Sequence, residues 1–129
     1  MVRSIVSNKA AQHQNPVPNA AMHRGILVTS GILGKDLKTG AYPADKEHQI
    51  SLAFQYLEAI LSEAGAVLQD VVKVDLYFAD KSDRPLANSH WTRLWPDPNH
   101  RPARQAHECP MPPGCCLQIT AMAVVHQSL

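Results

Sequence analysis

Two arginines, two histidines, a glutamate and a cysteine lie within one ten-residue segment, from His100 to Cys109. A guanidinium binds a carboxylate through two parallel N–H donors, imidazoles and carboxylates transfer protons, and thiolates are nucleophiles. A turn rich in proline and glycine follows the segment, and an apolar run comes after it. We therefore take residues 100–109 as the candidate centre of the protein's chemistry.

Arg104 is the candidate ligand anchor of this segment. If residues 103–109 form a strand, alternation places Arg104 and Glu108 on one face and His107 on the other. Glu108 is then either a general base or the salt-bridge partner of Arg104. We favour the salt bridge, because a guanidinium beside a carboxylate lowers its pKa and makes it a poorer base. A structural or interfacial role is expected for His107.

The cysteines do not form a metal-binding pattern. Cys109, Cys115 and Cys116 contain no Cys-x2-Cys pair, and adjacent cysteines in a strand point to opposite faces. We expect no metal and no cofactor. Cys116 is also a possible nucleophile, on the face of Thr120, but nothing in the sequence indicates a lowered pKa.

The overall composition predicts one soluble domain over residues 1–129, with 45% hydrophobic and 18% charged residues. An odd number of cysteines, two of them adjacent, favours a reducing compartment, and no run approaches the roughly 20 apolar residues of a membrane span. A cytoplasmic protein without a membrane partner is expected. Trp91 and Trp95 have only Arg93 beside them, so packing is favoured over base stacking and no nucleic-acid partner is expected.

The elements that must position these residues follow from periodicity. Apolar residues at spacings of three and four predict a helix after Pro43, with Asp45 as N-cap and Gly65 at its C-terminal end. A shorter helix, capped by Ser82 or Asp83, carries Ala87, Trp91, Leu94 and Trp95. Strands are predicted at 2–7, 20–31 (two strands turning at Arg24-Gly25), 71–79 (with Val72, Val74, Leu76 and Phe78 on one face), 103–109 and 116–125.

This order predicts an α+β fold with two helices on one face of a mixed sheet of about six strands. The second face would carry Thr29, Tyr77, Gln118, Thr120 and Met122. This mixture of side chains is too apolar for a face exposed to solvent and too polar for the interior of a hydrophobic core. We therefore expect an oligomer that joins sheets face to face.

Seven short segments, taken together, resemble the RidA/YjgF family of imine and enamine deaminases in order and spacing, over residues 15–125. They are Val-Thr-Ser-Gly (28–31), Lys-Thr-Gly (38–40), Leu-Ser-Glu-Ala-Gly-Ala (61–66), Leu-Gln-Asp-Val-Val-Lys-Val (68–74), Asn88, Arg-Pro-Ala-Arg (101–104) and Ile-Thr-Ala-Met-Ala-Val (119–124). The resemblance implies a chorismate-mutase-like fold and a homotrimer whose sheets form a central barrel. It also implies three ligand clefts between subunits.

By this resemblance Arg104 binds the substrate carboxylate, and the other substrate-binding positions are Gly31, Asn88, Val17 and Cys116. Thr120 stands where typical members have a glutamate that activates water, and Val17 stands where they have a tyrosine. Thr120 and Glu108 are thus the candidate catalytic residues. The implied activity is hydrolytic deamination of a small carboxylate-bearing imine or enamine. A non-catalytic trimer that binds a small carboxylate or has a regulatory role is the alternative.

Overall fold

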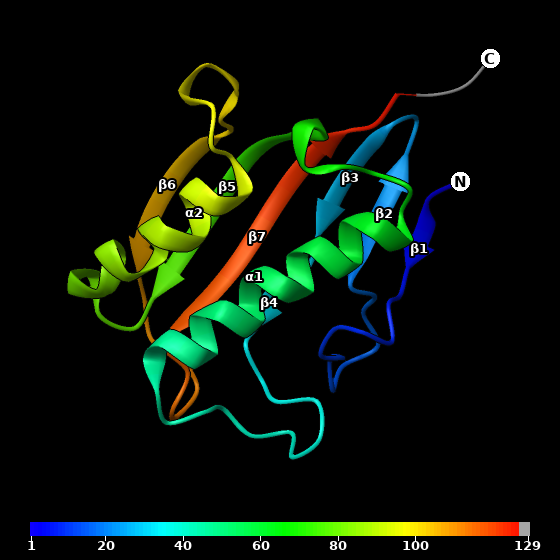
Figure 1. Cartoon of the computed structure of the whole chain (residues 1–129). Coiled ribbons are helices and arrows are strands. Elements are labelled where there is room, and N and C mark those ends of the chain that lie inside the picture. The colour runs from blue at the N-terminus through cyan, green and yellow to red at the C-terminus, as the bar shows by residue number, and fades with distance from the viewer. Residues whose placement is uncertain (127–129) are drawn as a thin grey trace.

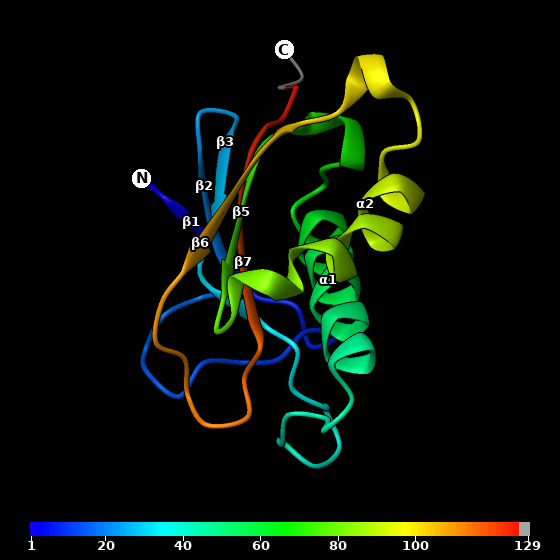
Figure 2. The same cartoon turned by 90° about the vertical axis from the view of Figure 1, so that its left-hand side faces the viewer.

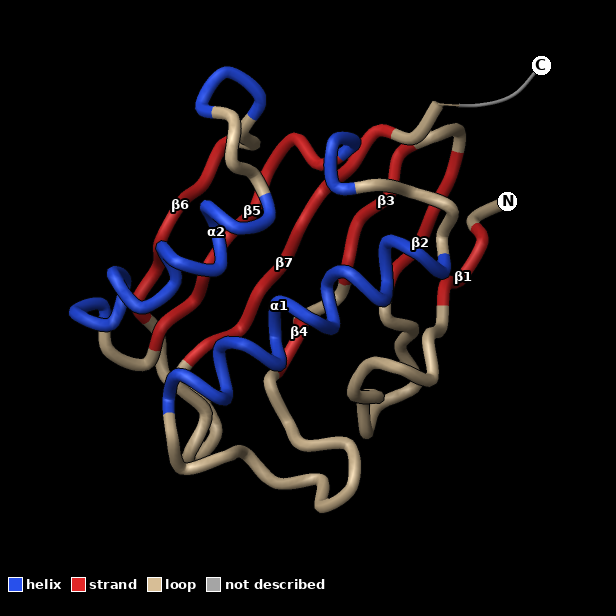
Figure 3. Tube along the Cα trace, viewed as in Figure 1, coloured by secondary structure: helices blue, strands red, loops and turns tan. Residues whose placement is uncertain are grey.

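The computed structural model describes residues 1–126 and contains one twisted sheet with two helices on the same side (Figures 1 and 2). The sheet has seven strands, in the order β1-β2-β3-β7-β5-β6, with the short β4 also paired to β7 (Figure 3). Their bounds are β1 Arg3–Ile5, β2 Ala20–His23, β3 Ile26–Thr29, β4 Ile32–Leu33, β5 Val71–Phe78, β6 Ala103–Glu108 and β7 Leu117–Val124. The pairing is antiparallel except between β5 and β6, so the expected mixed α+β sheet is confirmed.

Helix α1 (Lys46–Glu63) crosses one face of the sheet and begins and ends where the sequence predicts. The Asp45 side chain accepts a hydrogen bond from the backbone N–H of Glu47, which caps the first turn. Gly65 has a φ of 76°, and the next N–H, of Ala66, donates to the carbonyl of Leu61 at 2.8 Å. The buried side of α1, which includes Phe54 and Leu57, packs on the sheet.

The second helical segment begins earlier than predicted. Asp80, not Ser82 or Asp83, caps it, and the first part, Lys81–Ala87, is a 3₁₀ helix that continues into α2 (Asn88–Leu94). Trp91 and Trp95 are buried with their ring centroids 4.6 Å apart, which confirms packing rather than base stacking.

Strand β5 departs from the predicted alternation at one point. The register with β7 shifts between Val71 and Lys73, which is a bulge. As a result Val71 is buried and Val72 is exposed, the reverse of the prediction for Val72. Beyond the bulge Val74, Leu76 and Phe78 point inward as expected.

The second face of the sheet is not covered by the described residues of this chain (Figure 2). Met122 and Val124 on β7 are 39% and 52% exposed, and Val28, which pairs with Met122, is also exposed. An uncovered apolar sheet face of this kind fits the expected association with other copies.

Gln49 connects α1 to the turn that precedes β7, a role that no sequence pattern predicted. Its side chain is buried, donates to the carbonyls of Pro43 and Gly114, and accepts from the N–H of Cys116 at 2.7 Å. Because Cys116 is buried, its N–H would lose its partner without Gln49, so the Gln49 amide is a structural element of the fold.

We predict that Gln49→Leu, which keeps the volume but removes the amide, lowers the free energy of unfolding by about 3 kcal/mol. Urea denaturation measures the difference. The matched control is Gln55→Leu on the exposed side of the same helix, where the change is expected to stay within about 0.5 kcal/mol. Equal stability of the two variants would contradict the structural role of Gln49.

Candidate functional site

Arg104 lies on β6 and faces the helical layer. In the parallel register it stands beside Val74, which is completely buried on that side. Its guanidinium donates to the Asn88 side-chain oxygen at 3.0 Å and to the Arg84 carbonyl at 3.2 Å. The guanidinium carbon also lies 5.2 Å from the centre of the Trp91 ring, a distance typical of cation–π contact. Three neutral groups therefore hold the cation in one orientation.

The salt bridge expected between Arg104 and Glu108 does not form. Four residues along a strand span about 13 Å, which is too far for the two side chains to meet. Glu108 instead accepts a hydrogen bond from the N–H of Lys81 at 2.8 Å. Among residues 1–126, no carboxylate lies within salt-bridge distance of Arg104.

The electrostatic setting of Arg104 favours an anionic ligand. Partial burial, followed by the positive charge of Arg84, lowers the pKa of Arg104 from its usual value. A guanidinium stays protonated at neutral pH even so, and its planar fork still has N–H groups available beyond the two in use. The negative charge of a carboxylate bound there would counteract this lowering of the pKa, because it stabilises the protonated guanidinium.

Thr120 lies on the opposite face of the sheet from Arg104. It is a half-buried residue of β7 between the buried Ile119 and Ala121, and it pairs with Asp75 of β5. Gly31 lies close to this region, because a Cβ on residue 31 would come within 2.1 Å of the side-chain nitrogen of Gln118.

Val17 is exposed in the loop that precedes β2, and the end of that loop is fixed near Gly31. The carbonyl of Asn19 accepts a hydrogen bond from the N–H of Ser30, the residue before Gly31, at 2.9 Å. Gly31 and Thr120 thus form an outer group, whereas Arg104 and Asn88 form a helix-side group. A single chain does not bring the two groups together.

Cys116 belongs to neither group. It is only 6% exposed, lies just before the first residue of β7 and is part of the hydrophobic core. Burial, together with the neighbouring Cys115, raises the pKa of Cys116 to about 11. The thiol is therefore a weak nucleophile in this structure.

Two features of the site were missed by sequence reasoning. One is the Trp91 ring beneath Arg104, since Trp91 was assigned to packing alone. The other is Asp75, whose carboxylate accepts from His107 at 2.9 Å on the outer face. Alternation along β5 and β6 places Asp75 and His107 on that face, but only the register of the two strands brings these residues together.

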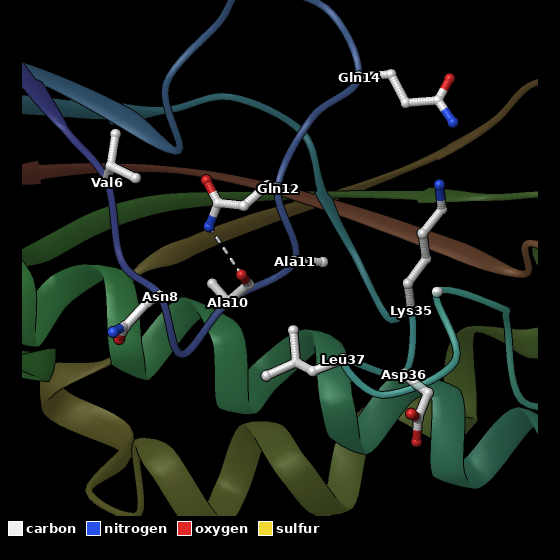
Figure 4. Close-up of a pocket in the computed structure, with 10 residues that line it drawn as sticks. Val6, Asn8, Ala10, Ala11, Gln12, Gln14, Lys35, Asp36 and Leu37 are labelled. Atoms are coloured by element: carbon white, nitrogen blue, oxygen red, sulfur yellow. Dashed lines mark hydrogen bonds between the residues drawn. The ribbon is translucent and has the colours of Figure 1, made fainter.

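One surface hollow of about 670 Å³ lies away from these residues, between the N-terminal loop and the turn that begins at Lys35 (Figure 4). Its carboxylate, Asp36, already accepts from the N–H groups of Lys38 and Thr39. The amide of Gln12 donates to the carbonyl of Ala10 at 2.9 Å. Its polar groups thus stabilise local turns, so we do not place the site there.

Within the described residues, 1–126, no cluster of three or more histidine, cysteine, aspartate or glutamate side chains is arranged to bind a metal ion. Neither is any helix in that range long and apolar enough to span a membrane.

The chain is an α+β protein whose sheet carries a partly buried arginine on its helical side and polar groups on its outer face. The family described as Endoribonuclease L-PSP matches residues 8–125. The chain belongs to this family, and the resemblance to RidA/YjgF proteins is confirmed.

Individual relatives span nearly the whole chain. A RutC family protein of Haemophilus influenzae is 30% identical over 96% of this chain and 98% of its own length. The 2-iminobutanoate/2-iminopropanoate deaminase of Escherichia coli is 27% identical with the same coverage. The crystal structure of RidA from an Antarctic Psychrobacter superposes with a TM-score of 0.86 at 27% identity, over 95% of this chain and 99% of that one.

We predict that iodoacetamide at pH 8 labels Cys109 well before Cys116 in the folded protein. Cys109 is partly exposed, whereas Cys116 is buried and has a pKa of about 11, which leaves roughly one thiolate in a thousand at that pH. Mass spectrometry of timed samples measures the order. Labelling in denaturant, where all three cysteines should react, is the control, and labelling of native Cys116 as fast as Cys109 would contradict the structure.

Proposed function

We propose that the protein is a hydrolytic deaminase of a small imine or enamine that carries a carboxylate, releasing ammonia and a 2-oxo acid or related carbonyl compound. The observation that carries the proposal is Arg104. Neutral partners orient its guanidinium, and no carboxylate of the described chain neutralises it. The family contains 2-iminobutanoate/2-iminopropanoate deaminases, which supports this substrate class.

The active unit is proposed to be a homotrimer with its sites between subunits. Arg104 and Asn88 lie on the helical side of the sheet, and Thr120 lies on the outer side. A small substrate cannot touch both groups of one chain, since the sheet lies between them. Contact between the outer face of one copy and the β6 edge of the next would complete the site, and it would cover the exposed Met122 and Val124.

In this site the guanidinium of Arg104 binds the substrate carboxylate and fixes the position of the C=N bond. A water held near the Thr120 hydroxyl of the neighbouring copy attacks the carbon. The resulting carbinolamine loses ammonia and leaves a carbonyl group. Because imines also hydrolyse in water, positioning and polarisation supply most of the acceleration that is needed.

The alternative is a trimer that binds a small carboxylate without turnover. It is favoured by Thr120, whose hydroxyl can hold a water but is no base at neutral pH. Calorimetric binding of 2-oxobutanoate together with ammonia release no faster than the spontaneous rate would select this alternative.

We predict that Arg104→Lys lowers kcat/KM for imine hydrolysis roughly 100-fold, because lysine cannot make two parallel hydrogen bonds to the carboxylate. The imine is generated in situ from its amino acid by an amino-acid oxidase, and ammonia release is corrected for the spontaneous rate. Arg93→Lys is the control, since Arg93 makes only a long, exposed 3.4 Å contact with Glu58. Equal activity of Arg104→Lys and wild type would refute the clamp.

Mixed assembly tests whether the site is shared between copies. We predict that chains with Arg104→Ala and chains with Thr120→Trp are each inactive but regain about a quarter of wild-type activity when mixed equally and reassembled. Random mixing makes three quarters of the trimers mixed, and each mixed trimer has one intact site of three. Light scattering checks that both variants assemble. No recovery in verified mixed trimers would contradict a shared site.

A further inference from the structure

A carboxylate and an imidazole lie on the outer face of the sheet, next to Thr120, and they have no part in the clamp at Arg104. Asp75 on β5 pairs directly with Thr120 on β7. The Asp75 carboxylate accepts a hydrogen bond from the His107 ring at 2.9 Å, and the Lys73 ammonium lies 3.6 Å from the same oxygen. The His107 ring is stacked on Tyr77, with centroids 4.5 Å apart and planes inclined by 14°.

Directly opposed residues of an antiparallel pair have Cβ atoms about 4.5–5.5 Å apart. A single water can therefore contact the hydroxyl of Thr120 and the carboxylate of Asp75 at once. The contacts of Asp75 with His107 and Lys73 both use the same oxygen, Oδ1. The other oxygen, Oδ2, remains to accept a proton, and the Asp75 side chain is 21% exposed, so solvent reaches it.

The attack of water on an imine carbon needs a proton acceptor beside the water, and Thr120 cannot be that acceptor at neutral pH. Of the two carboxylates near the candidate site, Glu108 faces the helical side and accepts from Lys81. Asp75 is the one that shares a face with Thr120.

We propose that Asp75 is the general base of the reaction and that His107 is its positioning residue. The inference rests on the deaminase activity proposed above. Asp75 takes a proton from the water, whose oxygen bonds to the carbon of the protonated imine while the C=N π electrons move to nitrogen. The neutral carbinolamine and a protonated Asp75 result.

The second half of the reaction uses the same carboxyl group. Asp75 returns its proton to the amine nitrogen and then accepts the hydroxyl proton as the C–N bond breaks and the C=O bond forms. Ammonia leaves as ammonium after it takes that proton. The net change is protonated imine plus water to carbonyl product plus ammonium. His107 donates to Oδ1 throughout and, stacked on Tyr77, keeps Oδ2 directed toward the water.

The decisive variant is Asp75→Asn, which keeps shape and removes the base. We expect kcat for imine hydrolysis to fall at least about 100-fold while KM changes less than about threefold, because Arg104 still binds the carboxylate. Asp97→Asn is the matched control, since Asp97 also lies beside a histidine, His100, but in an exposed loop away from the site. Its activity is expected to equal that of wild type.

A second-site variant separates a base from a merely structural aspartate. The register places residue 75 of β5 beside residue 120 of β7. The double variant Asp75→Asn, Thr120→Glu therefore moves the carboxylate from β5 to the neighbouring position on β7. We expect its kcat to be at least about tenfold higher than that of Asp75→Asn alone. His107→Phe, which keeps a ring to stack on Tyr77 but has no donor, should lower kcat without raising KM.

The outcomes distinguish the two proposals. If the wild-type protein accelerates imine hydrolysis and Asp75→Asn has the same kcat, the role of Asp75 is overturned and the deaminase proposal stands. Wild-type protein that does not accelerate any carboxylate-bearing imine tested overturns both. A loss in Asp75→Asn that Thr120→Glu does not reverse, with raised KM and a lower unfolding temperature, shows a structural role and also overturns the inference.

Discussion

The central feature of the candidate site is one partly buried cation, Arg104, that has no counter-ion among the described residues, 1–126. Arg104 is held by the amide of Asn88, the carbonyl of Arg84 and the ring of Trp91, all neutral groups. Each of these contacts orients the Arg104 guanidinium without neutralising its positive charge. A surface arginine used only for stability usually meets an aspartate or glutamate, and such a pair contributes little free energy. We propose that the arrangement at Arg104 instead keeps a defined binding position for a carboxylate from outside the chain.

The sheet imposes the second constraint, because it separates Arg104 from the groups that would act on the rest of a ligand. Strand β7 lies at the centre of the sheet, between β3 and β5, and presents Thr120 to the outer face. Strand β6 is the edge strand and presents Arg104 to the helices. The proposed contact with another copy of the chain would both cover the exposed apolar residues on the outer face and complete the site.

Much of the fold could be predicted because local rules decide it. Asp45 and Gly65 mark the ends of α1, and the turn at Arg24-Gly25 has positive φ at both residues, as a two-residue hairpin requires. The bulge in β5 could not be predicted, because Val71 and Val72 are the same residue type and alternation alone fits either one. The start of the second helical segment was misplaced for a similar reason, since Asp80, Ser82 and Asp83 can all act as caps.

The sequence indicates Arg104 as a candidate anchor, which stays a prediction, but it does not indicate the residues that contact Arg104. A guanidinium in this segment indicates anion binding by its chemistry, and the family resemblance points to Arg104 through the Pro-Ala-Arg motif. Arg101 in fact donates to the backbone carbonyls of Trp95 and Pro96. The pair of Asp75 and His107 joins residues that are 32 positions apart. Only the parallel register of β5 and β6 brings them together, and no local pattern contains that information.

The most direct test of the central claim is a crystal structure with 2-oxobutanoate, the carbonyl analogue of an imine substrate. The account predicts that both carboxylate oxygens accept from the Arg104 guanidinium of one copy. The ligand's carbonyl carbon should face Thr120 and Asp75 of the adjacent copy. A ligand bound in every copy with its carboxylate away from Arg104, or a cleft that stays empty at saturating concentration, would contradict the account.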